Sequence, residues 1–381
     1  KANILNVNVG GVVFETTRQT ITQQKGSLLD EIFSGRHSVS KDLNGNIFLD
    51  RDPHNFRVLL NYLRDPTCAP IPRDDRESFE IYTEAKLLQV RLLPHSFLFV
   101  IGGHSGHQFL SSVELYDSQK NTFIGGRHLE TERAYAGGES LSNRIISFGG
   151  QNLNYKALAD TEIFDVLRDC WTSGPPLNTP RRNVMSACLD DNVVYCMGGY
   201  DGRQFLSSVE CYDIRTLRWM KVGEMPSPVS SASTLTHDGR VFILGGTEGS
   251  RSNAVHEFDP RMNRWQTIPS LQKIRSASAA VTFLGHYFVF GGADEKNDIL
   301  NSVEYLVNDG KQWKDYDAMP DKRMEFTVNL LDDTTLMLVG GVNKCEILDS
   351  SYFFKPESCV WEQGPPLNTP RCGHSSVLTA F

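Results

Sequence analysis

The sequence predicts two domains: a small α+β domain over residues 1–94, followed by an all-β, six-bladed propeller over residues 95–381. Three observations indicate this division. A chain of 381 residues is too long for one ordinary core, since domains usually hold about 100–200 residues. A unit of 46–49 residues recurs six times after residue 95, whereas the segment before it carries helical periodicity and no copy of the unit. With 40% hydrophobic and 22% charged residues, the composition is that of a globular protein.

The repeated unit is an apolar stretch that ends in two glycines, followed by one aromatic residue and then a second. Twelve of the 31 glycines stand in these pairs, and all five tryptophans occupy the second aromatic position. A unit of this length with several short β-rich runs is typical of a four-stranded propeller blade. The glycine pairs are Gly102-Gly103, Gly149-Gly150, Gly198-Gly199, Gly245-Gly246, Gly291-Gly292 and Gly340-Gly341. The first aromatic residues are Tyr116, Phe164, Tyr212, Phe258, Tyr305 and Phe353, and the second are Phe123, Trp171, Trp219, Trp265, Trp313 and Trp361.

Each recurring residue has a structural role in such a blade. The glycine pairs allow positive φ and close backbone approach, and the tryptophans pack one blade against the next. A glutamate precedes the first aromatic residue in five repeats, and we expect it to accept backbone hydrogen bonds, because a buried carboxylate is costly without them. We expect Cys196, on an inner strand before a glycine pair, to be a buried, small apolar residue. The glutamates are Glu114, Glu162, Glu210, Glu257 and Glu304, with Ser351 in the sixth repeat.

The first repeat lacks a preceding strand of its own, whereas a spare strand stands at the C-terminus. Arg371-Cys372-Gly373 and the run that follows to Phe381 resemble Arg133-Ala134-Tyr135 and Arg275-Ser276-Ala277, each of which leads into a strand. We therefore expect the C-terminal strand to complete the first blade and close the ring, which removes the exposed edges of an open sheet.

Residues 1–94 follow a different pattern. Gly10-Gly11 joins two β-rich runs and predicts a hairpin. Asp52-Pro53 is an N-cap followed by proline at the first helical position, and the apolar residues from Phe56 to Leu63 recur at helical spacing. A second amphipathic segment starts at Ser78, and a short link around 93–95 joins this domain to the propeller.

Charge and cysteine content exclude several classes of function. The net charge of −8 arises entirely after residue 95 without any basic run, so the chain is a poor candidate for nucleic-acid binding. None of the eight cysteines forms a C-x-x-C pair, the ten histidines are scattered, and no catalytic or Walker motif occurs. We therefore expect a protein that is not an enzyme, with no cofactor, no metal site and free thiols in a reducing compartment. No apolar run approaches the about 20 residues of a membrane helix, so we expect no direct membrane insertion.

Arginines at the start of the inner strands are the candidate partner-binding residues. Arginine binds carboxylates in a bidentate manner, so a ring of arginines at the channel rim of an acidic domain would dock an acidic peptide. The alternative is that these arginines pair with carboxylates of neighbouring blades. The six residues are Arg133, Arg181, Arg182, Arg275, Arg323 and Arg371, and the fourth repeat has Pro228-Val229-Ser230 at this position.

Several motifs resemble known families. The repeat over residues 97–381 resembles the kelch repeat. Asn8-Val9-Gly10-Gly11, together with Phe48-Leu49-Asp50-Arg51-Asp52, resembles the BTB/POZ domain of the potassium-channel-tetramerisation type. Arg181-Arg182-Asn183 and Tyr195-Cys196-Met197-Gly198-Gly199 narrow the resemblance to the apicomplexan Kelch thirteen family.

The resemblance implies a scaffold that forms a homo-oligomer, expected to be a dimer, through its BTB domain and binds protein partners on the propeller face. It also implies a cytoplasmic location, peripheral at the plasma-membrane endocytic pore (cytostome or micropore), with roles in uptake of host material and in the response to artemisinin-type drugs. The chain opens at Lys1, and we expect the coiled-coil region of that family to precede it. A second interpretation stays open: a substrate adaptor of a cullin-based ubiquitin ligase, for which BTB–kelch pairing is usual. Leu93-Pro94 leaves no room for the helical domain that most such adaptors carry.

Overall fold

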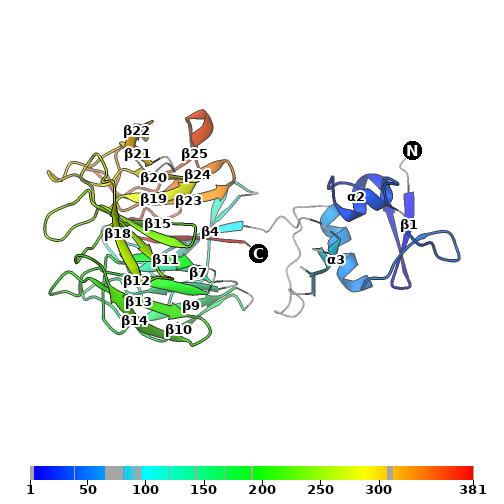
Figure 1. Ribbon diagram of the computed structural model, residues 1–381, viewed down its shortest axis with the longest axis horizontal. Coiled ribbons are helices and arrows are strands. Elements are labelled where there is room, and N and C mark those ends of the chain that lie inside the picture. Colours follow the sequence, from blue (N-terminus) through cyan, green and yellow to red (C-terminus); the bar gives the residue numbers. More distant parts are fainter. Residues whose placement is uncertain are drawn as a thin grey trace. The chain divides into compact units, whose positions relative to one another are not determined.

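A computed structural model describes residues 4–380 of the chain, except 38, 65–79, 82, 86, 89, 91–95, 119, 142–143, 167, 190–191 and 307–311. The chain divides into two compact units, with Lys1–His95 in the first and Ser96–Thr379 in the second. Helices lie in the first unit and sheets dominate the second (Figure 1). We describe each unit by itself.

The first unit is a small α+β domain. The predicted hairpin is confirmed: β1 (Ile4–Val9) pairs antiparallel with β2 (Val12–Thr17), and β3 (Ile47–Leu49) joins β1 in parallel. The helices whose bounds the structure describes in this unit are α1 (Arg18–Ile21), α2 (Leu28–Phe33) and α3 (Pro53–Arg64).

Helix α3 begins where the sequence predicts. Asp52 Oδ1 accepts the backbone N–H groups of His54 at 2.8 Å and Asn55 at 2.9 Å, which satisfies two unpaired donors of the first turn. Phe56 and Leu59 are at most 1% exposed in the core of this unit. The start of the second predicted helical segment, Ser78, lies outside the described residues.

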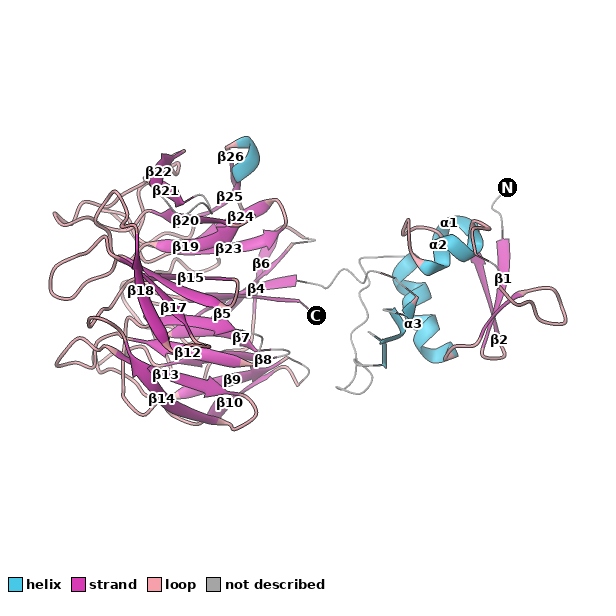
Figure 2. Cartoon of the chain, in the orientation of Figure 1, coloured by secondary structure: helices cyan, strands magenta, loops and turns pink. Residues whose placement is uncertain are grey.

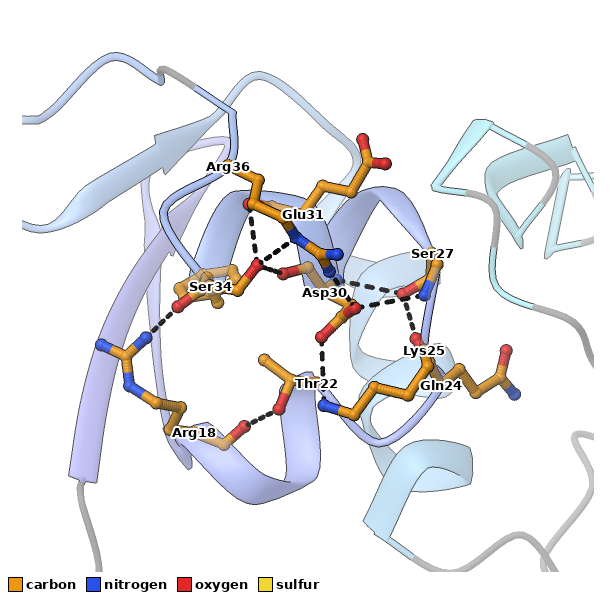
Figure 3. A network of polar contacts seen from close by, with 11 residues as sticks. Arg18, Thr22, Gln24, Lys25, Ser27, Asp30, Glu31, Ser34 and Arg36 are labelled. Carbon is orange, nitrogen blue, oxygen red and sulfur yellow. Dashed lines mark hydrogen bonds and ion pairs between the residues drawn. The ribbon is translucent and has the colours of Figure 1, made fainter.

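A polar network holds the start of α2 (Figure 3). The Ser27 hydroxyl accepts the Asp30 N–H at 3.1 Å, and the Asp30 carboxylate accepts the Gly26 N–H at 3.1 Å. Lys25 and Arg36 pair with the same carboxylate. Ser27 is thus the N-cap of α2. The Gly26 N–H, followed by Lys25, lowers the pKa of Asp30, so this carboxylate stays ionised and fixes the turn that precedes the helix.

The described residues of the second unit form six four-stranded antiparallel sheets. Figure 2 shows the strands of these sheets, which we describe as the blades of a propeller. The first sheet has the order β27 (Ser375–Ala380), β4 (Ser96–Ile101), β5 (Val113–Asp117), β6 (Thr122–Gly125). The second contains β7 (Gly137–Leu141), β8 (Arg144–Phe148), β9 (Thr161–Asp165) and β10 (Cys170–Gly174), and the third β11 (Met185–Leu189), β12 (Val193–Met197), β13 (Ser208–Asp213) and β14 (Arg218–Glu224). The fourth contains β15 (Ser233–His237), β16 (Arg240–Leu244), β17 (Val255–Asp259) and β18 (Arg264–Ile268), and the fifth β19 (Ala279–Phe283), β20 (His286–Phe290), β21 (Val303–Leu306) and β22 (Trp313–Tyr316). The sixth contains β23 (Thr327–Asp332), β24 (Thr335–Val339), β25 (Ser351–Lys355) and β26 (Val360–Gln363), with a 3₁₀ turn, η1 (Pro356–Ser358), between the last two.

The glycine pairs and tryptophans stabilise each blade. Both glycines of every pair have positive φ, and at Gly245 a Cβ atom would lie 2.3 Å from the Arg275 carbonyl oxygen, so no larger residue fits. In the fifth and sixth blades the residues opposite the tryptophans are Leu306 and Phe354. Tyr305 and Phe353, the recurring aromatic residues of these two repeats, lie on strands as expected. Each stands one residue before the partner of the tryptophan, so its side chain points to the other face of the sheet, because side chains alternate along a strand.

The six inner strands, one from each sheet, surround a central channel. Neighbouring inner strands are joined by side chains: Ser186 Oγ donates to Glu139 at 2.6 Å, and Thr234 Oγ1 donates to the Ser186 carbonyl at 2.8 Å. Asn329 Nδ2 donates to Ser376 Oγ at 2.5 Å, which links β23 to β27. The channel holds a cavity of about 460 Å³ lined by these strands.

A closed ring of backbone hydrogen bonds lies at one end of this channel. One residue in each blade, two positions before the inner strand, takes a left-handed conformation with φ between 52° and 60°. The N–H of each donates to the carbonyl of the corresponding residue in the next blade around the ring, at 2.6–3.1 Å. The six residues are Tyr135, Asn183, Ser231, Ala277, Glu325 and Gly373. We call the end of the propeller that carries this ring, the glycine pairs and the loops after them the loop face.

Candidate partner-binding site

Five of the six candidate arginines are buried, and one is accessible to solvent. Arg133, Arg181, Arg275, Arg323 and Arg371 are each at most 1% exposed. Arg182 is half-buried. The expected arginine ring at the channel rim is therefore wrong for the five buried residues, because their guanidinium groups lie inside the protein.

Arg181 shows what a buried arginine does in its blade. Its Nη1 donates to the carbonyl oxygens of Gly198 and Ser208, each at 3.0 Å, and its Nη2 lies 2.6 Å from Glu210 Oε1. Glu210 also accepts the backbone N–H groups of Asn178 at 2.8 Å and Thr179 at 3.2 Å. The pair thus ties the segment entering the blade to its glycine turn and its third strand. This confirms the expected backbone role for Glu210, and Glu114, Glu162 and Glu304 likewise accept backbone N–H groups.

The same pair recurs in three other blades. The distances are 2.7 Å for Arg133–Glu162, 2.5 Å for Arg275–Glu304 and 2.5 Å for Arg371–Glu114. Burial lowers the pKa of Arg275, and the facing Glu304 carboxylate opposes that shift. A buried ion pair of this kind is tolerated only with excellent geometry and additional hydrogen bonds, and each of these pairs has both.

The two remaining blades show how a missing partner is replaced. The fourth blade has Val229 at the arginine position, and Arg240 of the neighbouring strand pairs with Glu257 at 2.5 Å instead. The sixth blade has Ser351 at the glutamate position, and Arg323 pairs with Asp321 at 2.6 Å. In the other four blades, the recurring glutamate was the signal in the sequence that the arginine already has a partner.

Arg182 is the candidate arginine that the loop face presents to solvent. Its guanidinium stacks over the Tyr200 ring, 5.3 Å from the centroid, and donates to Gln151. Among the described residues it has no carboxylate partner. The loop that follows Gln151 carries Leu153 and Tyr155, whose exposed fractions are 53% and 70%. We call Arg182, Leu153 and Tyr155 the Arg182 patch.

Arg251 is a second half-buried arginine of the loop face, and the sequence did not indicate it. Its Nε donates to Ser276 Oγ at 2.6 Å, and its Nη1 donates to the Asp294 carbonyl and to Asn297 Oδ1, each at 2.7 Å. It stands in the loop after a glycine pair rather than before an inner strand, so the repeat pattern gave no reason to select it.

A cluster of four polar side chains also lies on the loop face. Tyr135 OH donates to Glu325 Oε2 at 2.9 Å and lies 2.8 Å from His104 Nε2, which is 3.1 Å from Cys372 Sγ. Burial, followed by the Glu325 charge, raises the pKa of both the Tyr135 phenol and the Cys372 thiol. We call these residues the His104 cluster.

Two further groups line the channel or the blade core. Burial raises the pKa of Glu139, on the inner strand β7, to about 7. Cys196 is 0% exposed, as the sequence predicts, but it lies on β12, the second strand of its blade, and not on an inner strand. Burial raises the pKa of its thiol to about 12. A buried thiol of this kind is unreactive, so Cys196 has a packing role.

Within the described segments, no helix has the length and apolarity that crossing a membrane requires.

Comparisons with known proteins agree with this geometry. The BTB/POZ domain family matches residues 5–93, and the KLHDC2/KLHL20/DRC7 Kelch-repeats domain family matches residues 96–284. The chain is a BTB/POZ domain followed by a kelch-repeat propeller. The predicted fold class is thereby confirmed. The architecture is that of protein-binding scaffolds and adaptors, which are typically not enzymes: BTB domains mediate oligomerisation, and kelch domains bind proteins.

Individual relatives match one part of the chain each. The Kelch repeat-containing protein kel-10 of Caenorhabditis elegans is 24% identical over 47% of this chain and 31% of its own length. Kelch-like protein 35 of Mus musculus is 30% identical over 42% of this chain and 27% of its own length. The BTB/POZ domain-containing protein KCTD21 of Homo sapiens is 37% identical over 23% of this chain and 34% of its own length. The chain thus spans about a third or less of these relatives.

The solved structure of YjhT shares the fold. Its TM-score is 0.59 at 12% sequence identity, and the match covers 71% of this chain and 97% of that chain. At this identity the likeness concerns the fold alone.

Proposed function

We propose that the chain is a non-enzymatic scaffold that assembles copies through its BTB domain and captures a partner protein on the loop face of its propeller. The observation that carries the proposal is the Arg182 patch. It combines a solvent-accessible guanidinium without a carboxylate partner among the described residues with two exposed apolar side chains. Arginine and tyrosine are enriched among the residues that dominate binding energy at protein interfaces.

The patch fits a peptide that places a carboxylate beside an apolar residue. Stacking on Tyr200 holds the Arg182 guanidinium in a defined plane, so less side-chain entropy is lost when it binds a carboxylate. Tyr155 lies 6.1 Å from Phe109, ring centroid to ring centroid, so its exposed ring rests on a neighbouring aromatic side chain. The patch therefore needs little reorganisation on binding.

The cellular role that we propose is that of an endocytic-pore component. The support is the sequence resemblance to the apicomplexan Kelch thirteen family, carried by motifs that include Arg181-Arg182-Asn183. In this role the protein is cytoplasmic and peripheral at the plasma-membrane pore, takes part in uptake of host material, and affects the response to artemisinin-type drugs. We also propose a homo-oligomer, a dimer, as the assembled form, which the mass of the full chain in solution tests.

The test is affinity capture from apicomplexan cells with the full chain as bait, comparing the wild type with Arg182→Glu. Arg203→Glu is the matched control, because Arg203 is an exposed arginine of the same loop face, in the loop after Gly198-Gly199, that does not belong to the patch. We expect vesicle-coat proteins to be captured by the wild type and the control, and to be lost with Arg182→Glu. Equal capture by all three baits would exclude the patch as the binding site.

The alternative is a substrate adaptor of a cullin-based ubiquitin ligase. It is favoured by the pairing of a BTB domain similar to that of KCTD21 with a kelch domain similar to that of Kelch-like protein 35. The two domain matches are separated by residues 94 and 95 alone, which leaves no intervening helical domain. Co-purification of a cullin without coat proteins in the same experiment would select this alternative.

A further inference from the structure

Three potential metal ligands converge on the loop face from distant parts of the chain. His104 stands in the loop after the first glycine pair, Glu325 before β23, and Cys372 before β27. One ligand atom of each lies within 4.8 Å of those of the other two. Cys372 and His104 are 268 residues apart, so no spacing motif in the sequence reveals the group.

Two of the three donor separations lie close to those of a tetrahedral zinc site. With zinc bonded to nitrogen or oxygen at about 2.0–2.2 Å and to sulfur at about 2.3 Å, tetrahedral geometry separates the donor atoms by about 3.3–3.6 Å. His104 Nε2 lies 3.1 Å from Cys372 Sγ and 3.9 Å from Glu325 Oε2. Shifts of about half an ångström would bring both separations into this range.

The backbone around the three residues is fixed by hydrogen bonds. His104 N donates to the Cys372 carbonyl at 2.9 Å, and Cys372 N donates to the His104 carbonyl at 3.1 Å. Gly373 N donates to the Glu325 carbonyl at 2.9 Å within the closed backbone ring. The donors are thus held on a rigid scaffold before any ligand binds, which reduces the entropy cost of assembling a site.

We propose that His104, Glu325 and Cys372 form a zinc-binding site on the loop face. Imidazole, thiolate and carboxylate together suit Zn²⁺, whereas Mg²⁺ and Ca²⁺ prefer oxygen donors alone. On binding, the Cys372 thiol loses its proton to solvent and its sulfur bonds to the metal. The thiolate and the Glu325 carboxylate then balance the two positive charges of the zinc ion.

The neighbouring groups complete the site. Tyr135 OH donates to Glu325 Oε2 and so orients this carboxylate, as hydrogen-bond donors around metal ligands usually do. Gly106 N donates to His104 Nδ1 at 3.3 Å, and this long contact is given up when Nε2 binds the metal and Nδ1 carries the proton. The side chains of His104 and Glu325 are 23% and 22% exposed, which leaves an entry path from solvent and room for water as a fourth ligand.

The site lies where the propeller is closed. His104 follows β4 and Cys372 precedes β27, and these two strands are neighbours in the first sheet. Glu325 adds the sixth blade. A bound zinc ion would therefore join the two ends of the propeller chain and the adjacent blade, and we expect it to raise the melting temperature.

The experiment is titration of the metal-free full chain with Zn²⁺ alone, in competition with a chromophoric chelator. We expect one tight site per chain in the wild type. Affinity should fall at least about tenfold in His104→Gln and in Cys372→Ser, since even residues that only orient ligands change affinity by about 10–100-fold. The matched controls are His107→Gln, from the same loop, and Cys345→Ser, which removes an exposed free thiol. Both controls should keep wild-type affinity.

Cobalt substitution gives a second measurement. Co²⁺ in this site should show a sulfur-to-metal charge-transfer absorption that Cys372→Ser abolishes and Cys345→Ser retains. Tryptophan fluorescence shows that each variant is folded, and His104→Gln changes a partly exposed side chain, so it keeps the test valid if Cys372→Ser unfolds. Unchanged zinc affinity in His104→Gln, or loss of the site in the Cys345→Ser control, would overturn the proposal. Because no partner protein enters this experiment, its outcome is independent of the proposed scaffold function.

Discussion

Two adjacent arginines allow a direct comparison of a buried strut with a surface residue. Arg181 is 0% exposed and pairs with Glu210, whereas Arg182 is half-buried and stacks on Tyr200. Methionine fills much of the volume of either side chain without its charge or donors. We therefore expect Arg181→Met to destabilise the propeller strongly and Arg182→Met to leave its stability almost unchanged.

The magnitude follows from the bonds that are lost. Arg181→Met leaves the Glu210 carboxylate buried at 1% exposure without its cation, and removes donors from the carbonyl oxygens of Gly198 and Ser208. Breaking a buried ion pair by removing one partner costs about 3–5 kcal/mol. At roughly 2 °C per kcal/mol for a domain of this size, the melting temperature should fall by about 6–10 °C. Arg182→Met should change the free energy of unfolding by no more than about 0.5 kcal/mol.

Thermal unfolding followed by tryptophan fluorescence is the appropriate assay. All five tryptophans lie between residues 171 and 361, so the signal reports on the propeller and not on the BTB domain. A melting temperature of Arg181→Met within about 1 °C of that of Arg182→Met would refute the strut interpretation. In that case the Arg181–Glu210 pair would contribute no net stability.

Three further predictions concern the channel, the blade core and the ring. Burial raises the pKa of Glu139 from 4.5 to about 7, so this group's contribution to stability is greatest below pH 4.5 and falls as the pH rises to about 7. Glu139→Gln should abolish this decline and should be more stable than the wild type above pH 7. The gain should be on the order of 1 kcal/mol, because solvent in the channel screens the charge. Identical stability–pH profiles of the two proteins, measured by urea denaturation, would contradict this prediction. Cys196→Phe should lower the free energy of unfolding by about 1–3 kcal/mol through overpacking against Phe148 and Trp219, with Cys196→Ser as the small control. Deleting residues 375–381 removes β27 from the first sheet and should abolish the single cooperative melting transition seen by circular dichroism; an unchanged melting temperature would show that ring closure adds nothing.

Much of the fold could be predicted because the same sequence unit occurs six times. The glycine pairs recur because the backbone geometry at these positions admits only glycine. The tryptophans recur because a large ring fills the same space in each blade. The spacing alone did not show which residue lies opposite the tryptophan in the last two blades, where Leu306 and Phe354 take that position next to Tyr305 and Phe353. Side-chain alternation along β21, and not residue type, decides which of two neighbours faces the tryptophan.

The site was harder to predict, for physical reasons. Arg181 and Arg182 are adjacent in the sequence and precede the same strand. One guanidinium is paired inside the blade, whereas the other faces solvent. The buried arginine of a blade is the one that pairs with the recurring glutamate on the third strand. The repeats with Val229 at the arginine position or Ser351 at the glutamate position indicate this pairing, because each lacks one member of it. The His104 cluster could not be found from spacing at all, because closure of the ring brings its members together.

The closed backbone ring stabilises the propeller without depending on which side chains stand at the loop face. The six contacts use main-chain N–H and C=O groups, yet the residues that make them are tyrosine, asparagine, serine, alanine, glutamate and glycine. Substitutions at these positions therefore alter the surface around the channel mouth without removing a bond of the ring. A lineage of such proteins is free to diversify what this mouth recognises while the architecture that displays it stays constant.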